Sequence, residues 1–189
     1  MTIWLNILDG IIMNSRINII QGDITQLDVE AIVNAANPSL MGGGGVDGAI
    51  HRAAGPKLKE ACRPLRGCHT GDAKITDGFD LKAKYVIHTV GPVWNNNTQS
   101  EEALLASAYR RSLEVAAEHG VRTIAFPSIS TGAYRFPFEK ATTIALREIT
   151  QFLDEHSQPE QVTLVAFSEK DYRRMNKIYQ DEKRNQKNQ

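Results

Sequence analysis

Four consecutive glycines, Gly42 to Gly45, separate an apolar run from a segment with helical periodicity. The run Ala31–Ala35 has the character of a strand, and a helix is expected to start near Val46. Glycines lack Cβ atoms, so backbone N–H groups in such a loop can converge closely on a ligand. The N-terminus of the following helix adds a partial positive charge. A strand, a glycine loop and a helix in this order therefore predict an α/β fold with an anion site that needs no lysine or arginine.

The glycine loop differs from the two best-known phosphate-binding motifs. A Walker A loop requires Gly-Lys-Ser/Thr after its glycines, whereas Gly45-Val46-Asp47-Gly48 stands here, which argues against an NTPase. The run Gly43–Gly48 does match G-x-G-x-x-G, but the acidic residue expected about 20 residues later is replaced by a turn at Gly67–Gly71. A nicotinamide-dependent oxidoreductase is left as a minor alternative.

A second loop of the same kind follows the predicted strand Thr123–Phe126. It contains Ser130, Thr131 and Gly132, whose N–H groups and hydroxyls donate hydrogen bonds without carrying a positive charge. Two such loops after strands favour a ligand with two linked phosphates. A third strand end offers Asp23, whose carboxylate suits an exocyclic amino group such as that of adenine. An aspartate at such a position more commonly caps a turn or helix, so both interpretations stay open.

Apolar strand-like runs alternate with helical patterns, which is typical of a layered α/β domain. The length of 189 residues and the 41% of hydrophobic residues fit one folded domain with a sizeable core. Strands are predicted at Ile17–Ile20, Ala31–Ala35, Ala73–Thr76, Tyr85–Val90, Thr123–Phe126 and Val162–Phe167. Besides the helix near Val46, helices are predicted at Glu101–His119, Pro137–His156 and Glu169–Lys183.

Charge and cysteine content limit the partners and the compartment. With 22 Lys/Arg and 22 Asp/Glu the net charge is zero, which argues against nucleic-acid or membrane-surface binding. Residues 170–189 have a net charge of +4, which we interpret as a solvated helix and tail. Residues 1–13 lack the features of a signal peptide or a membrane span. Two cysteines, Cys62 and Cys68, are too few for a disulfide framework, so a cytoplasmic protein is expected. Together with His69 they are also too few for a structural zinc site, which needs four ligands.

These segments resemble the macrodomain family, and specifically its MacroD-type branch. The resemblance covers Arg16 to about Tyr179 and extends to small bacterial O-acetyl-ADP-ribose deacetylases. It implies a three-layer α/β/α sandwich with a central mixed, mostly parallel sheet and ADP-ribose bound at the strand ends. The domain would span 14–182, after an extension or extra strand at 1–13 and before a polar tail at 183–189. The matching motifs are Gly22–Thr25, Ile32–Asn37, Gly42–Asp47, Val90–Pro92 and Phe126–Gly132.

The resemblance also implies roles for individual residues. Asp23 would accept from the adenine amino group, with the Ile24 backbone beside it and Phe167 stacked nearby. The loops Gly42–Val46 and Ser130–Tyr134 would enclose the diphosphate and the distal ribose. The catalytic pair would be Asn37, on the distal ribose, and Asp47, near the scissile ester. The residues expected to bind substrate are Asp23, Ile24, Asn34, Gly43, Gly44, Gly45, Val46, Ser130, Thr131, Gly132, Ala133, Tyr134 and Phe167.

The implied activity is hydrolysis of ADP-ribose esters: deacetylation of O-acetyl-ADP-ribose or removal of mono-ADP-ribose from Asp/Glu side chains of proteins. No metal or cofactor is implied, and a monomer is expected. Because no G-x-S-x-G motif is present, a covalent acyl-enzyme is not favoured. Asp47 is the only carboxylate in the glycine loop and is expected to position water, with help from a substrate phosphate. A non-catalytic ADP-ribose reader, or a regulator of a protein partner, is the alternative.

Three further residues bear on the site. His51 lies one helical turn after Asp47 and could donate a hydrogen bond to it, although a helix-face histidine is more common. His88, inside a buried strand, is expected to be a core histidine with its hydrogen bonds satisfied. Arg135 and the following phenylalanine depart from the Gly-Tyr that is common in relatives, which bears on loop flexibility and substrate preference.

Overall fold

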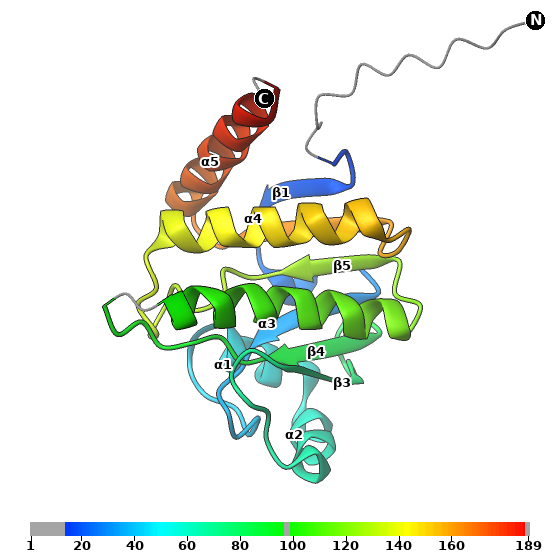
Figure 1. Ribbon diagram of the computed structural model, residues 1–189. Helices are drawn as coiled ribbons and strands as arrows, with labels where there is room; N and C mark the ends of the chain where they lie inside the picture. Colours follow the sequence, from blue (N-terminus) through cyan, green and yellow to red (C-terminus); the bar gives the residue numbers. More distant parts are fainter. Residues whose placement is uncertain (1–13, 97–98, 188–189) are drawn as a thin grey trace, which may run out of the picture.

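A six-stranded sheet divides the described part of the chain into two helical layers (Figure 1). The computed structural model describes residues 14–96 and 99–187. The strand order is β1-β6-β5-β2-β4-β3, and neighbours are parallel except for β3 and β4. This confirms the predicted three-layer sandwich with a mixed, mostly parallel sheet. The strands are β1 (Ile17–Gln21), β2 (Ala31–Ala35), β3 (Ala73–Asp77), β4 (Tyr85–Thr89), β5 (Thr123–Phe126) and β6 (Gln161–Ala166).

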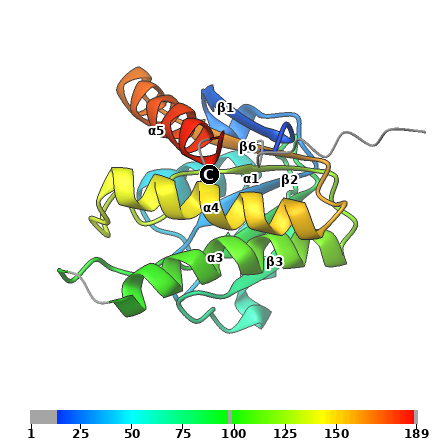
Figure 2. The same ribbon diagram turned by 45° about the horizontal axis from the view of Figure 1, so that its top comes forward.

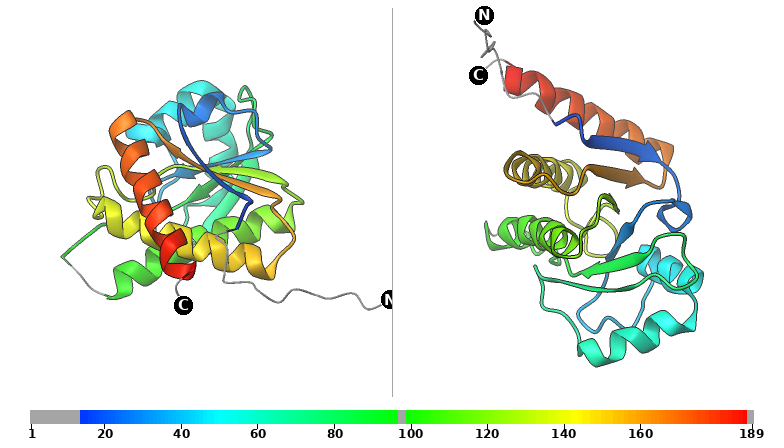
Figure 3. Two further views of the ribbon diagram at one scale, coloured as in Figure 1. Left: turned by 90° about the horizontal axis from the view of Figure 1, so that it is seen from above. Right: turned by 90° about the vertical axis from the view of Figure 1, so that its right-hand side faces the viewer.

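Two groups of helices cover the two faces of the sheet, as the edge-on view of Figure 3 shows. One face packs against α3 (Gln99–Glu118), α4 (Phe138–Glu155) and α5 (Glu169–Lys187). Helices α3 and α4 lie side by side there (Figure 2). The other face packs against α1 (Gly45–Ala54) and α2 (Pro56–Cys62), with short 3-10 turns at Ile24–Gln26 and Arg63–Leu65.

Strand β4 shows why the sheet is buried on both faces. Val86, Ile87, His88 and Thr89 are all fully buried, because successive side chains point to opposite helical layers. The predicted bounds of β2 and β5 are confirmed, and the other four strands differ by one residue at one or both ends.

Helix α3 begins two residues before its predicted start and ends one residue before its predicted end, and α4 is shorter than predicted by one residue at each end. Two larger differences concern α2 and α5. Helix α2 was not predicted; Gly55, at φ +82°, ends α1, and Pro56 at once begins a new helix whose Leu58 and Cys62 are buried. Helix α5 continues to Lys187, four residues beyond the predicted end, and so includes most of the segment expected to be a polar tail. The extension or extra strand expected at 1–13 lies outside the described residues.

The five parallel strands end at one edge of the sheet, on the left in Figure 1. The glycine loop, the second predicted loop and Asp23 all follow strands at this edge. Such an edge is where open α/β sheets bind ligands. No helix in the described ranges is long and apolar enough to cross a membrane.

Candidate functional site

Asn37 organises the glycine loop after β2 through its own side chain. Its Nδ2 donates to the Gly42 carbonyl over 2.9 Å. Its Oδ1 accepts from the backbone N and the Oγ of Ser39, over 3.1 and 2.6 Å. Gly42 and Gly45 adopt φ values of +94° and +57°, which other residues rarely adopt. The loop is therefore held in a defined shape by the protein itself.

Gly43 lies where a side chain would be tightly confined. A Cβ atom there would come within 3.1 Å of Asp47 Oδ2 and 3.3 Å of Asn37 Nδ2. The exposed backbone of Gly43 thus lies next to both residues of the predicted catalytic pair. Gly44 and Gly45 are also exposed, and Val46 is half-buried. The first part of the site, at the glycine loop, thus consists of the Asp47 carboxylate, the Asn37 amide and the exposed backbone of Gly43.

Asp47 lies in the first turn of α1, and its side chain is only 6% exposed. Its Oδ1 accepts a 2.8 Å hydrogen bond from Asn34 Nδ2, which rises from the centre of the sheet. His51 Nε2 lies 3.4 Å from the same oxygen, so the predicted neighbourhood is confirmed. The predicted hydrogen bond is not, since this nitrogen has no hydrogen-bond partner within the described ranges.

His88 is a buried core histidine, as expected, but it is connected to the site. Its Nδ1 lies 3.2 Å from Asn34 Nδ2, and its Nε2 lies 2.9 Å from Thr76 Oγ1. Burial and the nearby His51 lower the pKa of His88 to about 3, so it is neutral at pH 7.

The second loop, after β5, is strained at Ser130. This residue has φ +66° and is 6% exposed, and its Oγ has no partner among the described residues. A non-glycine residue in this region and a buried unpaired hydroxyl both cost free energy, so they indicate a functional constraint. Thr131 Oγ1 donates to the Ser128 carbonyl over 2.9 Å, while Gly132 and Ala133 are exposed.

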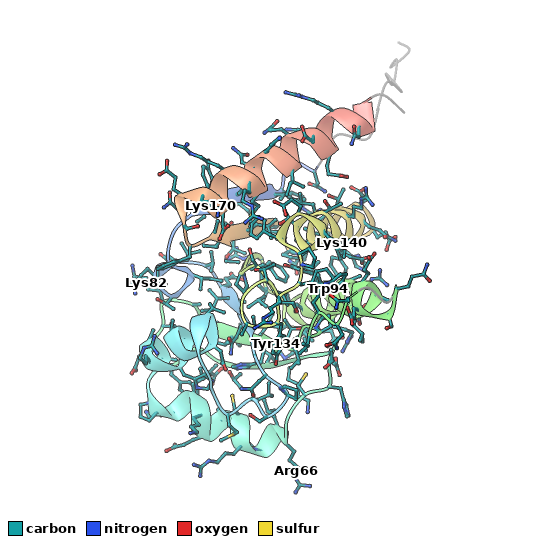
Figure 4. The ribbon with its side chains drawn as sticks, turned by 90° about the vertical axis from the view of Figure 1, so that its left-hand side faces the viewer. Arg66, Lys82, Trp94, Tyr134, Lys140 and Lys170 are labelled. Carbon is teal, nitrogen blue, oxygen red and sulfur yellow. The ribbon has the colours of Figure 1, made fainter. Side chains whose placement is uncertain are left out.

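The loop after β4 holds the second loop in place, a contact that the sequence did not reveal. Trp94 N donates to the Tyr134 carbonyl over 2.8 Å, and the Trp94 ring packs against Phe136 at a centroid distance of 4.6 Å. Figure 4, which faces the carboxyl ends of the parallel strands, shows Trp94, Tyr134 and Lys140 close together. Arg135 is exposed, at φ +60°, and its N–H donates to the Gly132 carbonyl.

The third part of the site, after the glycine loop and the second loop, lies at the ends of β1 and β6. The Gly22 N–H donates to the Ala166 carbonyl over 2.9 Å, which joins the two strand ends. Asp23 caps the short turn after β1 by accepting from Thr25 N and Oγ1, so the capping interpretation is confirmed. Asp23 is nevertheless exposed, beside the buried Ile24. Phe167 lies one residue beyond β6 and is 82% exposed.

The site contains few side chains that could bind an anion by positive charge, hold a metal ion or act as a nucleophile. Between 36 and 44 and between 127 and 136, Arg135 is the only lysine or arginine. Within 14–96 and 99–187, no group of three His, Cys, Asp or Glu side chains could hold a metal ion. Burial raises the pKa of both Cys62 and Cys68 to about 11, so these thiols are not poised as nucleophiles. What the arrangement offers an anion is neutral backbone and hydroxyl donors.

A mixed α/β/α sandwich with these loops at its strand ends defines a macrodomain fold. The Macro domain family model matches residues 33–145, and the chain belongs to this family. An O-acetyl-ADP-ribose deacetylase of Cronobacter sakazakii is 54% identical over 164 residues, covering 85% of this chain and 91% of that protein. An Oceanobacillus iheyensis macrodomain with ADP matches with a TM-score of 0.81 and 46% identity, over 86% of this chain and 89% of that one. A Trypanosoma brucei macrodomain in complex with ADP-ribose matches with a TM-score of 0.82 and 42% identity, over 91% of this chain and 72% of that one.

Proposed function

We propose that this protein binds ADP-ribose and hydrolyses its esters. The substrates would be O-acetyl-ADP-ribose and proteins carrying mono-ADP-ribose on Asp or Glu side chains. The deacetylase name of a relative 54% identical and the ADP-ribose bound by a related macrodomain support this proposal. The observation that carries it is the buried Asp47 carboxylate, held by Asn34 directly beside the open backbone of Gly43.

Binding would use three parts of the site: the ends of β1 and β6, the glycine loop after β2 and the second loop after β5. Asp23 accepts from the adenine amino group with its exposed carboxylate, and the exposed ring of Phe167 provides a stacking surface. Backbone N–H groups of the glycine loop and of the second loop hold the diphosphate, as helix N-termini and loops with converging N–H groups do for other anions. The unpartnered Ser130 hydroxyl donates to a phosphate oxygen, which relieves its buried and unsatisfied state.

Hydrolysis would take place beside Asp47. Asn37 orients the distal ribose, and Asp47 orients a water molecule toward the acyl carbon with help from a substrate phosphate. The water oxygen bonds to that carbon, the bond from the carbon to the ribose oxygen breaks, and the ribose oxygen takes up a proton. The products are ADP-ribose and a carboxylic acid, either acetate or the protein side chain. His51, 3.4 Å from Asp47 Oδ1, lies close enough to assist the proton transfer.

The test incubates the protein with O-acetyl-ADP-ribose and, separately, with a glutamate-linked mono-ADP-ribosylated protein, and reads the products by mass spectrometry. Asp47→Ala is expected to retain ADP-ribose binding and to lose turnover. Asp28→Ala, an exposed carboxylate at the opposite end of β2, is the matched control and keeps full turnover. Absence of product from both substrates, together with calorimetric ADP-ribose binding, would instead identify a reader. Full turnover by Asp47→Ala would refute the role of that carboxylate.

A further inference from the structure

A row of hydrogen bonds runs from the interior of the sheet to Asp47. Thr76 on β3, His88 on β4 and Asn34 on β2 present their side chains to the α1 layer, and Asp47 meets them from α1. Strands β2 and β4 are parallel, and Asn34 is the register partner of His88, so the two side chains point the same way. The proposed function uses only the end of this row.

We propose that His88 is a positioning residue for the reaction: it fixes the Asn34 amide, which in turn fixes the Asp47 carboxylate. The inference rests on the proposed ester hydrolysis and identifies what lies behind the carboxylate that orients water. His88 itself is fully buried, and Asn34, Thr76 and Cys62, whose side chains contact its ring, are buried as well.

The donors and acceptors along the row allow one arrangement. The Asn34 NH2 group has two hydrogens: one bonds Asp47 Oδ1 at 2.8 Å and the other faces His88 Nδ1 at 3.2 Å. His88 Nδ1 must therefore carry a lone pair, and the ring proton is on Nε2, where it donates to Thr76 Oγ1 at 2.9 Å. A flipped Asn34 amide would direct its oxygen at the Asp47 carboxylate, which is repulsive whichever ring nitrogen of His88 carries the proton.

A neutral His88 is required for this arrangement, and its surroundings maintain it. The groups that face the ring are Cys62, with Sγ 3.7 Å from Nε2, and His51, with ring centroids 6.4 Å apart, besides Asn34 and Thr76. Burial is the largest cause that lowers the pKa of His88, because it disfavours the imidazolium form. A protonated ring would have no lone pair for Asn34.

The consequence for the reaction concerns the direction of one oxygen. With Oδ1 of Asp47 held by Asn34, Oδ2 lies beside Gly43, whose exposed backbone is where the proposed function places the ligand. Without a fixed Asn34, the carboxylate can rotate about its side-chain bonds, and the water that it orients moves with it. A displacement of about 1 Å in such a group can cost about 100-fold in rate.

The experiment compares four variants by ADP-ribose calorimetry, by kcat and KM for O-acetyl-ADP-ribose, and by histidine 15N NMR. His88→Phe removes the acceptor, and kcat is expected to fall about 10- to 100-fold with unchanged ADP-ribose affinity. His88→Asn keeps an oxygen acceptor at the place of Nδ1 and restores most of kcat. Thr76→Val removes the acceptor for the ring proton and lowers kcat less. Cys62→Ala removes the 3.7 Å contact of Sγ with His88 Nε2 but leaves the Asn34 and Thr76 partners of the ring in place, and keeps the wild-type kcat.

The NMR measurement reads the ring proton without any turnover. A proton on Nε2 of wild-type His88 supports the inference, and a proton on Nδ1 overturns it. Equal kcat in wild type and a folded His88→Phe overturns the inference alone and leaves the proposed function intact. Equal loss of binding and kcat in all three variants of the row shows a purely structural role and also overturns it. If His88→Phe does not fold, His88→Asn and Thr76→Val decide. A wild-type protein without turnover refutes the proposed function, and the inference falls with it.

Discussion

Replacing Gly91 with alanine should destabilise the protein, because the added methyl group would clash with two neighbouring side chains. It lies just beyond β4, where the loop that follows this strand packs against the loop after β5. A Cβ atom at Gly91 would lie 2.6 Å from Ile129 Cγ2 and closer still to Ser130 Oγ. Ordinary carbon contacts are about 3.5 to 4 Å, so Gly91→Ala forces Ser130 and Ile129 to move by about 1 Å.

The cost follows from overpacking a well-filled site. Inserting a methyl group into such a site costs about 1–3 kcal/mol. In a chain of this size each kcal/mol lowers Tm by about 2–4 °C, so Gly91→Ala should unfold about 2–12 °C earlier in a thermal scan. Because Ser130 is displaced, the scan should also show a smaller upward shift of Tm with added ADP-ribose.

Two companion variants test the cause. Gly132→Ala lies in the loop after β5, as Ser130 does, but no atom lies within 4 Å of the added Cβ, so its Tm should match that of the wild type. Ser130→Gly removes the hydroxyl and lets the chain keep its positive φ without steric cost, so adding it to Gly91→Ala should recover part of the lost stability. A Gly91→Ala protein with the wild-type Tm would refute the steric reasoning.

Three further predictions concern a cap, a titration and a surface ring. Arg16 donates to four backbone carbonyls at the end of α4 and in the loop after it, so Arg16→Ala should lower the free energy of unfolding in urea by about 2 kcal/mol. Arg173 forms one exposed ion pair, with Glu169, so the control Arg173→Ala should lower it by less than about 0.5 kcal/mol. The pKa of His88 is about 3 in the folded protein, against an ordinary value of 6.5. Between these two pH values the unfolded chain binds a proton that the folded chain does not, so the free energy of unfolding should decrease as the pH falls from 6.5 toward 3. His88→Asn should lose less stability over the same pH range; an identical pH dependence of the two proteins would contradict this assignment. Phe167→Ala should weaken ADP-ribose binding in calorimetry without lowering Tm, because the ring is 82% exposed.

The fold was readable because its signals are local. The apolar run at Tyr85–Thr89 and the amphipathic patterns of α3 and α4 depend on neighbours in sequence, and they predicted the layers correctly. Helix α2 was missed because a seven-residue helix gives too short a pattern, and only the Gly55-Pro56 junction announces it. The end of α5 was placed early because a polar helix end and a polar tail have the same composition.

The site was predictable in its loops and hidden in its contacts. The glycine run and the position of Asp47 at a helix start follow from residue order alone. The link from Asn34 to His88 does not, because it depends on the register of two strands separated by more than 50 residues along the chain. The same holds for Gly91, whose neighbours come from the loop after another strand. Such contacts are set by tertiary packing rather than by any periodicity.

The hydrogen-bonded row from Thr76 to Asp47 has a consequence for local opening of the molecule. Asn34 and His88 lie on β2 and β4, which are inner strands of the sheet, so we expect their amides to open only with the whole sheet, whereas the glycine loop has exposed backbone. In native-state hydrogen exchange, the amides of Asn34 and His88 should exchange at rates set by global unfolding, and those of Gly43 and Gly44 orders of magnitude faster. The residues that aim the carboxylate thus belong to the slowest-exchanging unit of the protein, and those that first meet a ligand to the fastest.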